Sequence, residues 1–121
     1  MTTNLVAFTP GTDIHRAVGM LLEKRISGAP VIDEQGHLVG ILSSKDCLKV
    51  AFSASYHREP GGTVSNYMSS DVKTVDVAAD IVAVAEMFVK GPYRRFPVME
   101  NGRLVGLLSR HDILKAIEDL W

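Results

Sequence analysis

The chain carries one pattern of residues twice, and this internal repeat limits its possible folds more than any other feature. Each copy has an acidic residue before a predicted helix, a Pro-Val strand, and a Gly-h-h-Ser-x-x-Asp string in which h is apolar. These anchors lie at Asp13, Pro30 and 40–46 in the first copy, and at Asp80, Pro97 and 106–112 in the second. The offset between the copies, 66 or 67 residues, predicts two like structural units.

Each copy is predicted to run strand, helix, strand, strand, helix, which makes the fold class α+β. Thr12 or Asp13 is expected to cap the first long helix of the first copy, and Gly28 is expected to end it. In the second copy Asp80 starts the matching helix, and a Gly-Pro pair at 91–92 ends it.

Hairpins are expected over 30–42 and 97–108, with an Asn-Gly pair at 101–102 forming the tip of the second. Leading strands are expected near 5–8 and 72–75, and a short helical turn over 63–68. The final helices begin near Ser44 and Arg110. They are expected to bury five apolar residues, namely Leu48, Phe52, Ile113, Leu114 and Ile117.

The predicted domains are repeat 1 over 1–55, a connecting loop over 56–66 and repeat 2 over 67–121. The connection is rich in small and polar residues, which favour an exposed loop. One copy alone has a small sheet with helices on one side, so its other face needs covering. We expect the two copies to pack about a pseudo-twofold axis and to create paired clefts.

Composition excludes several classes of protein. With 13 basic and 14 acidic residues the 121-residue chain has a net charge of -1, so no overall field attracts nucleic acid or an anionic membrane. No apolar run approaches the roughly 20 residues of a membrane span. Cys47 is the single cysteine and the four histidines are scattered, so neither a disulfide nor a metal site is expected. We predict a cytoplasmic protein.

The two Ser-x-x-Asp strings admit two interpretations. Ser43 with Asp46, and Ser109 with Asp112, resemble a capping box, in which the serine and the acid satisfy each other's backbone N–H groups. Alternatively, the helix N-terminus attracts phosphate, and the aspartate accepts from the hydroxyls of a ribose. Both can hold together, and the repetition of the string favours ligand binding over capping alone.

With these motifs the chain resembles tandem cystathionine-beta-synthase (CBS) domains, a Bateman module, over nearly its whole length. The likeness includes both strings, the Pro-Val strands and the segment Val64-Ser-Asn-Tyr-Met68 before the second copy. The family commonly binds AMP, ADP, ATP or S-adenosylmethionine and regulates an attached or associated enzyme, transporter or channel. The resemblance implies a regulatory module that is not an enzyme, requires no cofactor and takes an adenosine nucleotide as its regulatory ligand.

The resemblance also implies which residues bind the ligand. Each cleft would combine the Ser-x-x-Asp string of one repeat with the segment before the proline of the other, the aspartates holding ribose hydroxyls. The implied site residues are Ser27, Gly28, Ala29, Ser109 and Asp112 in one cleft, and Ser43, Asp46, Arg94, Arg95 and Phe96 in the other.

The second of these clefts is the better suited to a phosphorylated ligand, because Arg94 and Arg95 offer donors to phosphate oxygens. A solvated arginine pair is the alternative. Phe96 either stacks on a base or fills the face of the sheet, and the sequence favours neither.

The predicted function is therefore a nucleotide sensor that forms a homodimer of four repeats and signals to a separate partner protein. The alternative is a module that dimerises or docks without ligand, using apolar helix faces around 48–52 and 113–121. An enzyme is disfavoured because the sequence offers no nucleophile with an adjacent base, no paired acids and no Gly-x-Gly-x-x-Gly loop. The sequence leaves open the ligand, its phosphates, the occupancy of the clefts, the partner and the orientation of the dimer.

Overall fold

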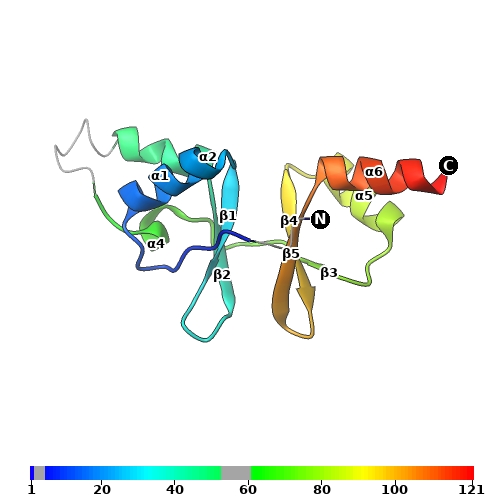
Figure 1. Cartoon of the computed structure of the whole chain (residues 1–121), viewed down its shortest axis with the longest axis horizontal. Helices are drawn as coiled ribbons and strands as arrows, with labels where there is room; N and C mark the ends of the chain where they lie inside the picture. Colours follow the sequence, from blue (N-terminus) through cyan, green and yellow to red (C-terminus); the bar gives the residue numbers. More distant parts are fainter. Residues whose placement is uncertain (2–4, 53–60) are drawn as a thin grey trace. The chain divides into compact units, whose positions relative to one another are not determined.

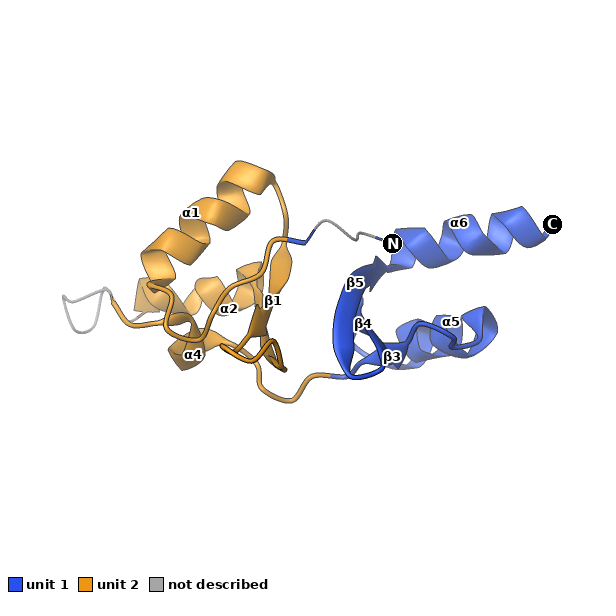
Figure 2. Cartoon of the chain, turned by 60° about the horizontal axis from the view of Figure 1, so that its bottom comes forward, with its two compact units in different colours: residues 1–5, 73–121 blue, residues 6–72 orange. Residues whose placement is uncertain are grey.

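A computed structural model describes residues 1, 5–52 and 61–121 and divides the chain into two compact units (Figures 1 and 2). The N-terminal unit is Val6–Val72, orange in Figure 2, and the C-terminal unit is Met1–Leu5 with Lys73–Trp121, blue in Figure 2. Each unit has its own small sheet and helices, which confirms the α+β class and the repeat. Residues 56–60 of the predicted connecting loop lie outside the described residues, and the pseudo-twofold packing stays a prediction.

The N-terminal unit is built around one antiparallel hairpin. Its elements are α1 (Ile14–Lys24), β1 (Gly28–Ile32), β2 (Leu38–Ser43), α2 (Ser44–Cys47) and α4 (Val64–Tyr67). β1 pairs with β2, as predicted. The leading strand is reduced to a single parallel bridge between Phe8 and Val31.

Gly40 of the repeated string allows a close approach of the backbone in this unit. Ser69 pairs with Ile41 through two backbone hydrogen bonds of 2.9 Å. A Cβ atom at Gly40 would lie 2.7 Å from the sulfur of Met68 and 2.9 Å from the carbonyl oxygen of Ser69. Glycine is therefore required here so that the segment after α4 can lie against β2.

Helix α1 begins as predicted and ends earlier than predicted. The carboxylate of Asp13 accepts a hydrogen bond of 3.1 Å from the backbone N–H of Arg16, so Asp13 is the N-cap. The predicted stop at Gly28 is wrong because that residue already belongs to β1. Arg25 ends the helix instead, in the left-handed conformation with φ 55°, and its N–H bonds to the carbonyl groups of Leu21 and Leu22.

The C-terminal unit has the same plan with a better-formed sheet. Its elements are β3 (Val75–Asp76), α5 (Ile81–Lys90), β4 (Arg95–Glu100), β5 (Arg103–Ser109) and α6 (Arg110–Leu120). β3 is parallel to β4, and β4 is antiparallel to β5. The predicted hairpin tip is confirmed, since Asn101 and Gly102 have φ values of 51° and 80°. Gly91 follows α5 as its C-cap, as predicted.

Each unit has its own hydrophobic core. The side chains of Phe8, Ile14, Val31, Leu42 and Val64 lie in the first core, and those of Val75, Val84, Phe88, Phe96 and Ile113 lie in the second. Tyr67 of α4 joins the first core, with its hydroxyl donating to the carbonyl of Gly61 at 2.9 Å.

The predicted burial of three helix residues is wrong. Leu48, Phe52 and Leu114 expose 67%, 72% and 66% of their surface, whereas Ile113 exposes only 7% and is buried as predicted. Ile113 and Ile117 are four residues apart on α6 and face the core together, so Leu114 is turned away from it. Leu48 and Phe52, also four apart, share the outward face.

Candidate functional site

The repeated serine and aspartate form a capping box in both units. In the N-terminal unit the Asp46 N–H donates to Ser43 Oγ at 3.1 Å, and Asp46 Oδ2 accepts from the Ser43 N–H at 3.0 Å. In the C-terminal unit the same bonds join Ser109 and Asp112 at 3.3 and 2.8 Å. The capping interpretation is therefore confirmed in both copies, with aspartate in the place of the usual glutamate.

This cap leaves only one carboxylate oxygen for a ligand. Each serine hydroxyl donates its proton to Oδ2 of its aspartate, at 2.9 Å in the first unit and 3.0 Å in the second. Ser43 and Ser109 can therefore only accept further hydrogen bonds. Oδ1 takes no part in either capping box, so it is the atom of each string that can accept from a ligand.

The two Oδ1 atoms have different surroundings. Asp46 Oδ1 lies 3.4 Å from the ammonium group of Lys49, and only 10% of its side chain is exposed. Asp112 Oδ1 lies 3.4 Å from the Met1 amine, with 23% of its side chain exposed. Partial burial raises the pKa of Asp112, but the hydrogen bonds from Ser109 and the charge of the Met1 amine outweigh it, so the pKa lies below its usual value. Asp112 is thus a carboxylate at neutral pH.

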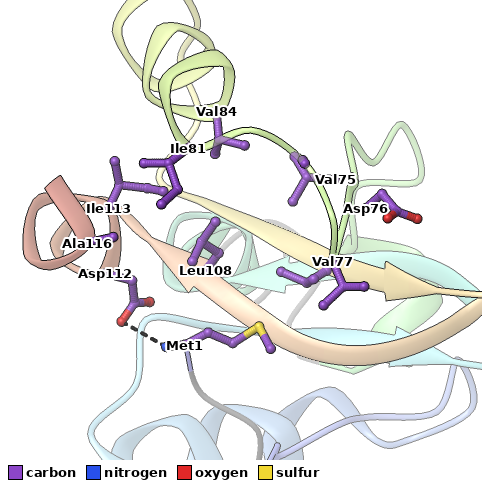
Figure 3. Close-up of a pocket in the computed structure, with 12 residues that line it drawn as sticks. Met1, Val75, Asp76, Val77, Ile81, Val84, Leu108, Asp112, Ile113 and Ala116 are labelled. Atoms are coloured by element: carbon purple, nitrogen blue, oxygen red, sulfur yellow. Dashed lines mark ion pairs between the residues drawn. The ribbon is translucent and has the colours of Figure 1, made fainter. Parts of the chain in front are cut away.

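A cavity of about 240 Å³ lies beside Asp112, within the C-terminal unit (Figure 3). Its walls come from Met1, the leading strand, the start of α5, the middle of β4, the end of β5 and the first turns of α6. Most of the lining is apolar and includes Val75, Val77, Ile81, Val84, Leu108 and Ile113. An apolar cavity bordered by two carboxylates, Asp76 and Asp112, suits a flat apolar group that carries a hydroxyl or N–H donor.

The sequence pointed to Asp112 but not to the walls of this cavity. The alternation Val75-Asp76-Val77 was the available signal, because it places two valines on one face of a strand. Which face meets the helices was decided by the pairing of Val75 with Val98 in the sheet.

The matching segment of the N-terminal unit is bonded to α4. Pro10 and Thr12 correspond in the repeat to Val77 and Ala79 of the cavity. Their carbonyl groups accept backbone hydrogen bonds from α4, from Ser65 at 3.0 Å and from Val64 at 2.8 Å. The segments beside the two Ser-x-x-Asp strings therefore have different neighbours, α4 in the N-terminal unit and the cavity in the C-terminal unit.

The segments before the prolines lie next to the strings of their own units. Gly28 pairs with Ser43, and Arg95 pairs with Ser109. Ser27 is exposed while Gly28 and Ala29 are buried. The combination of each segment with the string of the other repeat stays a prediction.

Phe96 and its two arginine neighbours differ in exposure. The ring of Phe96 is fully buried and contacts Phe88 and Tyr93, with ring centroids 4.6 and 4.9 Å apart, so it fills the sheet face and offers no surface to a base. Arg94 is exposed and Arg95 is half-buried. Burial lowers the pKa of the Arg95 guanidinium, and the charge of Arg94 lowers it further.

Two other features of the described residues bear on function. Burial raises the pKa of the Cys47 thiol and the Asp46 carboxylate raises it further, which favours a packing role over a reactive thiolate. No three His, Cys, Asp or Glu side chains gather as metal ligands within 1, 5–52 and 61–121. In the same part of the chain, no helix combines the length and the apolar character needed to cross a membrane.

The family model of the CBS domain matches residues 1–53 and 64–119. The chain belongs to the CBS domain family. Its structure is similar to that of the CBS-pair protein CBSX2 of Arabidopsis thaliana, solved in complex with AMP, with a TM-score of 0.86 and 29% identity over 99% of this chain and 93% of that chain. The resemblance to a tandem CBS pair is thereby confirmed.

Two curated relatives extend the comparison. An uncharacterized protein of Methanocaldococcus jannaschii is 26% identical over 100% of this chain and 42% of its own length. The chloroplastic CBS domain-containing protein CBSX1 of Arabidopsis thaliana is 29% identical over 88% of this chain and 56% of its own length. This CBS pair thus spans about half the length of these relatives.

Proposed function

We propose that this CBS pair is a regulatory module that binds an adenosine-containing ligand, rather than catalysing a reaction, and signals to a separate partner protein. The observation that carries the proposal is Asp112 Oδ1, which takes no part in the capping box and borders an apolar cavity. The AMP complex of CBSX2, at 29% identity, supports the choice of ligand class. A cytoplasmic location stays a prediction.

The cavity beside Asp112 has the apolar surface and the hydrogen-bond acceptor that can bind a nucleoside. Valine and isoleucine side chains of the lining can pack against a base, and a carboxylate oxygen can accept from a ribose hydroxyl. The capping box holds this carboxylate in place, because Oδ2 accepts from both the N–H and the hydroxyl of Ser109. Ser109 is thus proposed as a positioning residue and Asp112 as the ligand contact.

Calorimetry with AMP, ADP, ATP and S-adenosylmethionine tests the proposal on the whole chain. Asp112→Asn should weaken binding by about tenfold or more, because a buried hydrogen bond to a charged acceptor is lost. Asp119→Asn is the matched control, since it removes the same charge from an exposed position of the same helix. Absence of binding by all four compounds at millimolar concentration would remove adenosine sensing.

A second function is favoured by a separate observation. Large apolar side chains are exposed on the final helices, with Leu120 and Trp121 of the C-terminal unit at 68% and 95%. They fit a module that dimerises or docks on a partner without ligand. Sedimentation of the wild type and of Trp121→Ala tests whether this surface mediates association. If the module acts without ligand, nucleotides should leave its melting temperature unchanged.

A further inference from the structure

The cavity of the C-terminal unit matches, by the repeat, the surface that α4 covers in the N-terminal unit. Five buried residues of the N-terminal unit have counterparts that line the cavity. The pairs are Phe8 with Val75, Ile14 with Ile81, Ala17 with Val84, Val31 with Val98, and Leu42 with Leu108. In the N-terminal unit these five residues form one core cluster with Val64 and Tyr67 of α4. The repeat therefore indicates what kind of segment such a surface packs against.

Matched residues of the two surfaces differ in exposure. Ile14 is fully buried whereas Ile81 is half-buried, and Pro10 is half-buried whereas Val77 is 45% exposed. Among the described residues of the C-terminal unit, no helix takes the place of α4. The greater exposure is thus what the same surface shows when no helical turn lies on it.

Two carbonyl groups beside the cavity have the positions of the α4 acceptors. Those of Val77 and Ala79 match those of Pro10 and Thr12, which accept from the first N–H groups of α4 at 3.0 and 2.8 Å. Within 1, 5–52 and 61–121, no backbone N–H donates to the carbonyl group of Val77 or Ala79. Because the first N–H groups of a helix have no partner within it, these carbonyl groups can accept from an incoming helical turn.

The cavity calls for a turn with the side chains of α4 but not for α4 of a second copy. Val64 and Tyr67 lie three residues apart and expose only 0% and 8% of their surface. The Tyr67 hydroxyl already donates to the carbonyl group of Gly61 at 2.9 Å. Since α4 is engaged within its own unit, an equivalent turn has to come from another protein.

We propose that the cavity binds a helical turn of a separate partner protein, with a β-branched residue and an aromatic residue three positions later. The turn packs its two side chains against the apolar lining and donates its first N–H groups to Val77 and Ala79. Docking itself goes beyond the proposed function. One consequence rests on that function: an adenosine ligand that packs on the same valine and isoleucine side chains competes with the partner.

A peptide with the sequence of residues 61–69 serves as the probe of docking on the whole chain. The methyl groups of Ile81 and Ile113, which line the cavity (Figure 3), are labelled with ¹³C together with that of Ile14. We expect the peptide to shift the first two signals at millimolar concentration and to leave Ile14 unchanged. The Ile81 amide should then exchange several-fold more slowly, because its counterpart Ile14 donates to the carbonyl group of Gly62 at 3.0 Å.

Two matched controls test the contact. The peptide with Tyr67→Ser should bind about tenfold or more weakly, because it lacks the aromatic side chain that would fill the cavity. Ala116→Trp in the chain should abolish the shifts, since Ala116 lines the cavity. Lys115→Trp adds the same ring at the neighbouring exposed residue, which does not line the cavity, and should leave peptide binding unchanged.

The possible results separate docking from adenosine sensing. If the peptide leaves Ile81 and Ile113 unmoved at millimolar concentration, docking is wrong, and AMP can still bind. If the peptide binds and AMP neither binds nor displaces it, docking stands and adenosine sensing is wrong. Shifts that grow with the concentration of the chain alone would assign the cavity to a second copy and overturn a separate partner.

Discussion

The two units share a capping box but differ in what lies around it. In the N-terminal unit, α4 contributes Val64 and Tyr67 to the core and bonds to the carbonyl groups of Pro10 and Thr12. In the C-terminal unit, Val77 and Ala79 correspond to Pro10 and Thr12, and they border a cavity of about 240 Å³. Repetition of the motif thus preserves a local structure, whereas the segments packed around it differ between the units.

The cores of the units also differ at one matched position. Ala29 and Phe96 occupy the same place in the repeat and are buried to 1% and 0% exposure. The larger ring packs against Phe88 and Tyr93. The C-terminal core therefore depends on aromatic packing.

The largest expected loss of stability comes from removing the ring of Phe96. Phe96→Ala should lower the free energy of unfolding by about 3–5 kcal/mol, because a fully buried aromatic side chain leaves a cavity. Urea denaturation followed by circular dichroism measures it. Trp121→Ala, at a residue that is 95% exposed, should change it by less than about 0.5 kcal/mol. Equal effects of the two substitutions would contradict the dependence of the C-terminal core on the Phe96 ring.

A smaller loss of stability is expected from a substitution in α4, the helix that completes the first core. Val64→Ala should lower the free energy of unfolding by about 2 kcal/mol, since Val64 is fully buried. Hydrogen exchange should speed up at the Ile14 amide, which bonds to Gly62, and not at the Val77 amide, which bonds to Met99. Val82→Ala, at an exposed valine of α5, is the control. Equal acceleration at both amides would show that the units do not respond separately.

The caps should have similar energies in the two units. Ser43→Ala and Ser109→Ala should each lower the free energy of unfolding by about 1 kcal/mol, because each removes a side-chain acceptor for a helix N–H. Thermal denaturation gives the values, with the exposed Ser70→Ala as control. No loss in one unit would mean that its serine is not a functioning cap.

The smallest expected effect is on the dependence of stability on pH. Because the folded state lowers the pKa of Asp112, its contribution to stability is complete above the ordinary pKa near 4 and is lost as the pH falls below it. Between pH 7 and pH 3 the wild type should therefore lose more stability than Asp112→Asn. Urea midpoints at several pH values measure this difference, and parallel curves for the two proteins would exclude it.

Much of the fold could be predicted from single residues and their neighbours. Asp13 caps α1, the Asn-Gly pair forms the second hairpin tip, and both Ser-x-x-Asp strings form capping boxes. These are interactions over three or four residues, which the order of the amino acids specifies directly. The end of α1 at Arg25 was missed because a left-handed arginine has no strong sequence signal.

The sequence by itself thus determined the repeat, the order of the elements and the position of Asp112 at a helix start. Only the tertiary structure decided that Leu48, Phe52 and Leu114 are exposed, that Phe96 is buried, and that the cavity lies beside Asp112. The physical reason is that local hydrogen bonds depend on near neighbours, whereas burial depends on segments that are distant in the chain. α4 lies against Pro10 and Thr12 across some 50 residues, and no periodicity within either segment encodes that contact.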